Sequence, residues 1–97
     1  MSKKNHEIPE EFREPIVVED ELDLHGFFPE QISEILTEYL PFAQEKNYRE
    51  VRIIHGKGKS KLKHAVIRFL KKSPLVESFH DAPPELGHWG ATIVVLK

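Results

Sequence analysis

The sequence contains no cysteine and no apolar run long enough to cross a membrane. The absence of cysteine excludes a disulfide framework and a thiolate metal site. A membrane span needs roughly 20 predominantly apolar residues, and residues 1–7 also lack the apolar segment of a secretory signal. We therefore expect a cytoplasmic protein without a membrane partner.

A chain of 97 residues is long enough for one small domain with its own core. Residues 1–14 are acidic, contain Pro9 and show no apolar periodicity. Such composition is typical of a disordered extension. We expect a disordered acidic segment at 1–14 and a single domain at 15–97.

The formal net charge of −2 conceals a strong separation of charge along the chain. Between residues 7 and 30 every charged side chain except Arg13 is acidic, whereas between residues 46 and 72 every one except Glu50 is basic. A basic block of this kind favours contact with phosphates, because a polyanion responds to local potential more than to total charge. A solvated helix surface explains the same block without a ligand.

The apolar spacing predicts two helices. The first begins near Pro29 and carries apolar residues at helical intervals from Ile32 to Ala43. Pro41 lies inside it and predicts a kink or two short helices, with the end near Lys46. The second has an apolar face from Leu62 to Leu70, a cationic outer face, and an end at 73–74, where a serine precedes a proline.

Four strands complete the expected fold. Two of them end in His-Gly, at Leu22–Gly26 and Val51–Gly56, and two more are predicted at Leu75–His80 and Ala91–Leu96. Residues 81–90 are too poor in helix formers for a crossover helix, so the last two strands should be antiparallel. The fold class is therefore α/β, a two-layer βαβαββ arrangement with a four-stranded mixed sheet. The continuously apolar last strand should lie inside the sheet, and the third at an edge.

The two His-Gly strand ends carry candidate catalytic residues. In an extended chain Asp23 and His25 share one side, so a carboxylate can orient an imidazole. If the two strands are parallel, His55 meets this pair at the same edge of the sheet. The group suits general acid–base catalysis. The alternative is that Asp23 caps a turn and the histidines are structural.

A glycine-bearing basic turn follows the second of these strands and opens the second helix, where backbone N–H groups favour an anion. It is not a nucleotide P-loop, because Ile53 stands where the first glycine is required. It is not a dinucleotide fingerprint either, because Lys61 stands where the third glycine is required. A plain tight turn is the alternative. The candidate nucleic-acid-binding residues here are Arg52, Gly56, Lys57, Gly58, Lys59, Ser60, Lys61 and Lys63.

Trp89 is the only tryptophan, and it precedes the last strand. It is a candidate for stacking on an unpaired base, although a half-buried lid is the alternative. Phe27 and Phe28 follow the first His-Gly, and we expect them to be packing residues.

Three segments together resemble the Smr domain, a small module related to part of certain MutS-type proteins. They are Leu22–Gly26 (LDLHG), Ile53–Gly58 (IIHGKG) and Gly87–Val94 (GHWGATIV). The resemblance implies a fold like the C-terminal domain of bacterial translation initiation factor three, nucleic-acid binding and, in many members, endonuclease activity. Members are linked to DNA nicking and to mRNA cleavage at stalled ribosomes.

The resemblance also assigns residues. Asp23 and His25 match the family's first motif, and Gly56–Gly58 match its glycine-rich loop. The chain has Lys59–Lys61 where that loop often carries a further glycine.

Our leading hypothesis is an endonuclease that prefers RNA and also accepts DNA. His25 is its acid–base group, Asp23 orients it, and His55 is a complementary partner. No metal is obligatory, because the 2′-hydroxyl of RNA is an internal nucleophile, but a divalent ion is compatible. The rival hypothesis is a non-catalytic module that binds structured RNA or the ribosome.

Overall fold

The computed structural model describes residues 18–58 and 60–97. The disordered extension expected at 1–14 lies outside the described residues, as does Lys59. The element order is βαβαββ, as predicted. The strands and helices are β1 (Asp20–Asp23), α1 (Ile32–Glu45), β2 (Glu50–Ile54), α2 (Ser60–Lys72), β3 (Val76–Asp81) and β4 (Ala91–Leu96), with short 3₁₀ turns η3 (Pro29–Gln31), η4 (Pro84–Leu86) and η5 (His88–Gly90).

The strands form one mixed sheet in the order β1-β2-β4-β3. β1 and β2 are parallel, and β4 is antiparallel to both β2 and β3. The prediction that the last strand lies inside the sheet and the third at its edge is therefore confirmed. β4 is buried at nearly every position, as an interior strand requires, whereas most of β3 is exposed. The two strands are antiparallel because the segment between them holds only the short turns η4 and η5 and no crossover helix.

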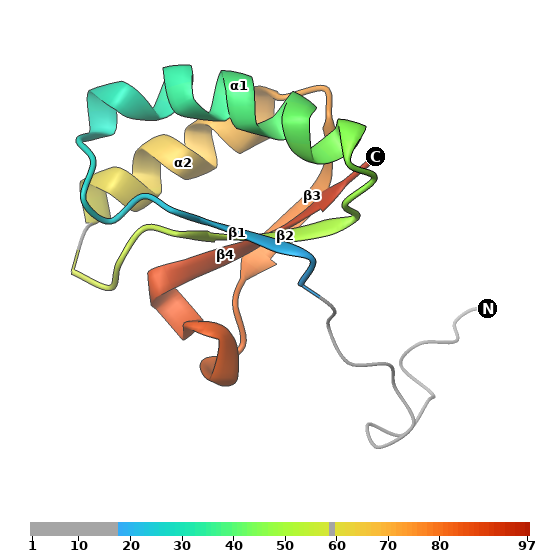
Figure 1. The fold of residues 1–97 in the computed structure, drawn as a ribbon. Coiled ribbons are helices and arrows are strands. Elements are labelled where there is room, and N and C mark those ends of the chain that lie inside the picture. Colours follow the sequence, from blue (N-terminus) through green and yellow to red (C-terminus); the bar gives the residue numbers. More distant parts are fainter. Residues whose placement is uncertain (1–17, 59) are drawn as a thin grey trace.

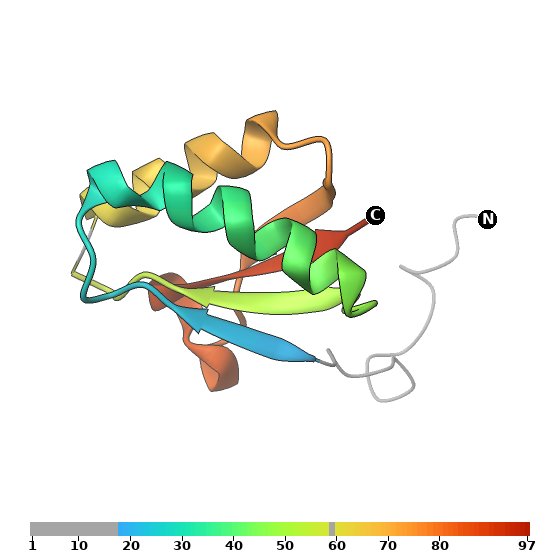
Figure 2. The ribbon, with the colours of Figure 1, turned by 45° about the horizontal axis from the view of Figure 1, so that its top comes forward.

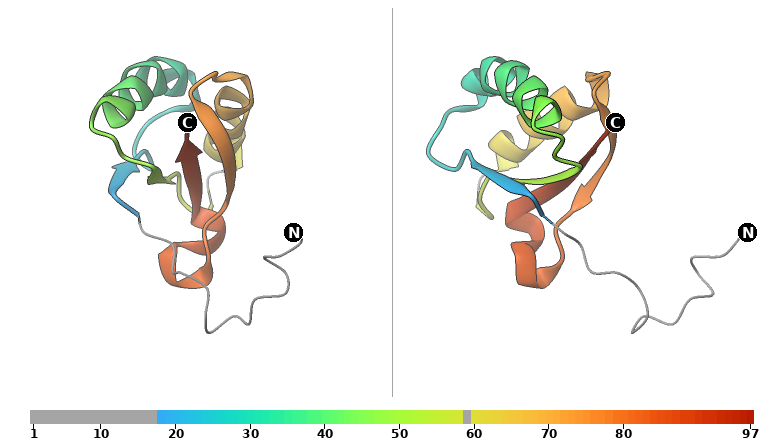
Figure 3. Two further views of the ribbon diagram at one scale, coloured as in Figure 1. Left: turned by 90° about the vertical axis from the view of Figure 1, so that its right-hand side faces the viewer. Right: turned by 45° about the vertical axis from the view of Figure 1, so that its right-hand side comes forward.

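Both helices pack on one face of the sheet (Figures 1 and 2). Alternation along β2 explains the two faces, because Val51 and Ile53 are fully buried on the helix side while Arg52 and Ile54 point the other way. Turns η4 and η5 lie against the second face (Figure 3). A smaller apolar cluster centred on Ile93 is buried there.

Helix α1 runs without interruption through Pro41. The predicted alternative of two short helices is wrong, because buried residues on both sides of the proline, Leu40 and Ala43, hold the chain against the core, and Pro41 itself is exposed. In the part of the chain that the structure describes, no helix has the length and apolar character that crossing a membrane would demand.

Candidate functional site

Three segments meet at the edge of the sheet where β1 and β2 end. The N–H of Leu24 donates to the carbonyl of Ile54 at 2.7 Å, which keeps the parallel pair together to its end. The carbonyl of Gly90, at the start of β4, accepts hydrogen bonds from the N–H groups of His55 and Gly56 at 3.0 and 2.9 Å. The loops that follow β1 and β2 therefore leave the sheet side by side (Figures 1 and 2).

Asp23 and His25 form a pair that is open to solvent. Nδ1 of His25 lies 2.5 Å from Oδ1 of Asp23, and the side chains are 63% and 52% exposed. The same carboxylate oxygen accepts the backbone N–H of His25 at 3.1 Å. The side-chain hydrogen bond to His25 lowers the pKa of Asp23, so the carboxyl is ionised at neutral pH.

This geometry fixes the tautomer of the imidazole. An ionised carboxylate only accepts hydrogen bonds, so Nδ1 of neutral His25 carries the proton. Nε2 is then left with a free lone pair. An oriented imidazole with an available Nε2 is the arrangement that a general base requires.

His55 lies elsewhere, and the expectation that both imidazoles face a substrate is wrong for it. Its side chain has no exposed surface, and its Nε2 lies 2.9 Å from the hydroxyl of Thr92. Alternation along β2 explains this, because His55 follows Val51 and Ile53 on the helix side of the sheet. The signal in the sequence was this alternation, because it places His55 on the same face as the apolar residues Val51 and Ile53.

Burial also changes the chemistry of His55. It lowers the pKa of His55, with a smaller contribution from the positive charge of Lys63, while the backbone of Gly56 and the charge of Asp81 oppose the shift. Nδ1 of His55 has no hydrogen-bond partner among the described residues. His55 therefore acts as a neutral core residue that supports the loop after β2.

The basic loop is exposed and lies close to the start of β4. Lys57 and Gly58 are both exposed. A Cβ atom added to Gly90 would lie 2.9 Å from Cγ and 3.2 Å from N of Lys57. Glycine at position 90 thus lets the loop rest on the strand. Ser60 and Lys61 follow as exposed residues in the first turn of α2.

Two predicted nucleic-acid-binding residues are occupied by protein partners. The guanidinium of Arg52 donates to a carboxylate oxygen of Glu21 and to the carbonyl of Leu86, both at 2.7 Å, and the side chain is only 18% exposed. Nζ of Lys63 lies 2.9 Å from Oδ1 of Asp81. The prediction for Arg52 is wrong, because its partly buried guanidinium already has two protein partners. The ion pair of Lys63 is at the surface, and its predicted role stays a prediction. A count of charges along the chain does not show which cations already have a partner.

The aromatic side chains near this edge are more exposed than expected. Trp89 is 61% exposed and stacks on His88 with the ring centroids 4.3 Å apart. The turn that presents it includes two residues with positive φ, Gly87 at 112° and His88 at 50°. Phe27 and Phe28 are 45% and 66% exposed, so the expectation that they are packing residues is wrong.

The cationic outer face predicted for the second helix includes His64, Arg68 and Lys72, and the structure places these three residues along a groove between α1 and α2 that the sequence did not predict. Their signal was the helical spacing of basic residues on one side of the second helix. Within residues 18–58 and 60–97, no group of three or more histidine or acidic side chains is arranged to hold a metal ion.

Three comparisons with known proteins match this chain to the same family. The family model described as the Smr domain matches residues 22–97. A protein of Staphylococcus carnosus named endonuclease MutS2 is 44% identical over 80 residues, which is 82% of this chain and 10% of that protein. The chain thus spans about a tenth of the length of the curated relatives it matches.

Two solved structures are similar to the whole described domain. The crystal structure of the Smr domain of Thermus thermophilus MutS2 has a TM-score of 0.76 and 35% identity, and the match covers 80% of this chain and 98% of that one. The structure of YdaL, a stand-alone small MutS-related protein from Escherichia coli, has a TM-score of 0.75 and 28% identity, with 79% and 63% covered.

Proposed function

Because this chain belongs to the Smr domain family, we propose that it binds nucleic acid and cleaves it as an endonuclease, with RNA as the preferred substrate and DNA as a second one. The observation that carries the proposal is the solvent-open pair of Asp23 and His25, with Nδ1 and Oδ1 2.5 Å apart. The proposal of endonuclease activity is also supported by the relatives that are named endonuclease MutS2.

The proposed reaction is a transesterification within the RNA strand. Nε2 of His25 takes the proton of a 2′-hydroxyl, and that oxygen forms a bond to the adjacent phosphorus. The bond from phosphorus to the 5′-oxygen breaks, and the leaving oxygen takes a proton from solvent. The products are a 2′,3′-cyclic phosphate and a 5′-hydroxyl. Asp23 keeps the imidazole in the productive tautomer throughout.

The loop after β2 is the proposed phosphate-binding element. Lys57, and Lys59 beside it in the sequence, supply charge, while the glycines Gly56 and Gly58 allow close approach of the backbone. Ser60 and Lys61 would extend these contacts into α2. Groups of this kind stabilise the charge that develops on the phosphate oxygens in the transition state. Trp89 is proposed to stack on a base next to the cleaved bond.

A second candidate function is a non-catalytic module that docks on structured RNA or the ribosome. The burial of His55 favours it, because only one of the two predicted imidazoles is accessible at the edge. Both functions require salt-sensitive binding, so affinity alone does not separate them. Cleavage does.

The test is cleavage of end-labelled RNA by the purified chain, compared with its variant His25→Gln. General acid–base groups contribute about 10²- to 10⁴-fold, so we expect the rate to fall at least 100-fold while RNA affinity and the circular dichroism spectrum stay unchanged. His80→Gln is the matched control, because it removes an exposed histidine from the edge strand β3. It should cleave like the unaltered protein.

Two further arms identify the nucleophile. A strand with a single 2′-deoxy residue at the cleaved position should resist cleavage, and cleavage of the RNA should persist with a chelator present. Equal rates for His25→Gln and the unaltered protein would refute the catalytic assignment. Absence of any cleavage with binding intact would favour the docking module.

A further inference from the structure

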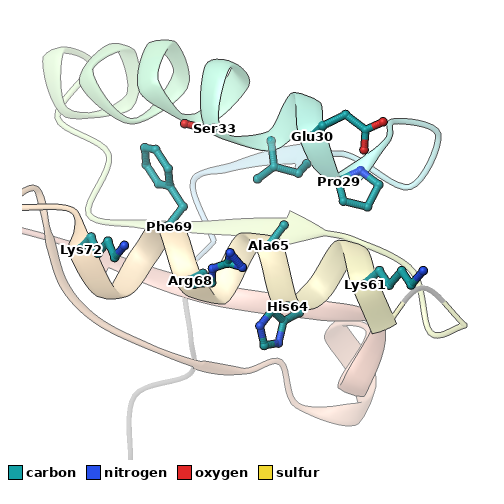
Figure 4. A pocket seen from close by; sticks show the side chains of 10 residues that line it. Pro29, Glu30, Ser33, Lys61, His64, Ala65, Arg68, Phe69 and Lys72 are labelled. Atoms are coloured by element: carbon teal, nitrogen blue, oxygen red, sulfur yellow. The ribbon is translucent and has the colours of Figure 1, made fainter.

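A groove runs between α1 and α2 and encloses about 580 Å³. One wall comes from the beginning of the first helical segment, with Pro29, Glu30 and Ser33, and the other wall is α2 (Figure 4). The residues of α2 that line it are Lys61, His64, Ala65, Arg68, Phe69 and Lys72.

The α2 wall is a stripe of exposed basic residues. Lys61, His64, Arg68 and Lys72 follow one another at intervals of three or four residues, so they lie along one side of the helix. At a rise of 1.5 Å per residue the stripe is roughly 16 Å long. Among the described residues none of these four forms an ion pair, and Glu30 is the one acidic side chain that lines the groove.

The floor of the groove is apolar. Ala65 and Phe69 are partly buried and project from α2 toward α1 (Figure 4). The buried Ile32 also lines the groove. A site for a free anion would not need such a floor. A nucleic-acid strand matches both features of the groove. Its phosphates can contact the cationic rim, and its base faces can stack on the ring of Phe69.

The groove begins next to the edge that carries the candidate site. Its α1 wall follows the loop after His25, and its α2 wall follows the loop that contains Lys57. Both helices begin on the side of the molecule where these loops leave the sheet (Figures 1 and 2). A strand bound at the edge is therefore next to the groove.

We propose that this groove binds the backbone of a single nucleic-acid strand as it leaves the edge of the sheet, an inference that rests on the proposed function. The two helices pack against each other, with axes about 8–10 Å apart, so the groove is a surface depression and the strand lies along it. Its apolar floor reaches base faces only where the bases are unpaired, which favours a single strand over a duplex. A stripe of this length spans about five nucleotides at the ~3.4 Å rise of a stacked strand, and fewer in an extended one.

The experiment compares two charge-reversed variants of equal charge. One changes the groove, Arg68→Glu with Lys72→Glu, and the other changes basic residues that do not line it, Lys46→Glu with Lys71→Glu. Binding is measured by fluorescence anisotropy with single strands of about 4 and about 14 nucleotides. The strands carry 2′-O-methyl groups so that cleavage cannot interfere. Cleavage is measured separately on unmodified RNA of both lengths.

We expect the groove variant to lose affinity for the long strand by about tenfold or more and its salt slope to fall by about 1.4, since each lost phosphate contact on a single strand contributes ~0.7. The control variant should change far less. Binding and cleavage of the short strand, which occupies only the edge, should be the same for both variants.

Equal losses in the two variants, or no loss in either, would overturn the inference. An equal loss with a duplex of the same length would overturn its restriction to single strands. Failure of the proposed function gives a different result. If the unaltered protein cleaves RNA of neither length but the groove variant alone loses affinity for the long strand, the groove inference stands and the nuclease proposal fails.

Discussion

Gly90 is the position at which the basic loop touches the start of β4, and we predict that Gly90→Ala destabilises the domain. The added methyl group would lie 2.9 Å from Cγ and 3.2 Å from the backbone N of Lys57, and 3.5 Å from the carbonyl carbon of Gly56. Two of these neighbours are backbone atoms, so the strain cannot be relieved by rotating a side chain alone. The loop or the strand must move.

The size of the effect follows from what such a movement disrupts. Overpacking of this kind costs about 1–3 kcal/mol. The carbonyl of Gly90 also accepts two hydrogen bonds, from the N–H groups of His55 and Gly56, and weakening them costs about 0.5–1.5 kcal/mol each. We expect a loss of about 2–4 kcal/mol in the free energy of unfolding, which lowers the melting temperature by roughly 10–20 °C for a domain of this size.

Urea unfolding followed by circular dichroism measures this free energy, with Gly58→Ala as the control. Gly58 lies in the same loop, and a Cβ atom there has no neighbour within 4 Å. Its substitution should leave the midpoint unchanged or raise it slightly, because alanine restricts the unfolded chain. Equal midpoints for the two variants would refute the argument that close approach requires glycine at position 90.

Two further predictions concern residues that the structure moves out of the candidate site. Burial lowers the pKa of His55 below the ordinary value of 6.5, so the unfolded chain binds the proton more readily, and stability should fall as the pH drops below about 6.5. His55→Gln should cost about 1–3 kcal/mol at pH ~7.5 and flatten this decline, whereas parallel pH profiles would contradict the role of His55. Arg52→Met should lower stability by about 1–2 kcal/mol, mainly through the lost hydrogen bond to the carbonyl of Leu86, because its half-exposed partner Glu21 contributes little. RNA affinity and its salt dependence should not change, and a tenfold weaker affinity would restore Arg52 as a phosphate ligand.

Local periodicity was enough for most of the fold. The apolar spacing of Leu62–Leu70 predicted α2, and the run Ala91–Leu96 matches β4 residue for residue. The antiparallel pairing of the last two strands also followed from the sequence, because residues 81–90 are too poor in helix formers for a crossover helix. The interior position of the last strand followed from its continuous apolar run. Pro41 was the exception, since packing of the apolar face on both sides of it outweighs its local cost within the helix.

The sequence by itself determined the element order and the pairing of Asp23 with His25, because both depend on neighbours along the chain and on the alternation of a strand. Only the tertiary structure decided which polar residues are available. His55 is buried against Thr92, Arg52 is held by Glu21, and Lys63 by Asp81. Partners such as these come from strands and turns far away in the sequence, and a charge that already has a partner is indistinguishable from a free one until those elements are brought together.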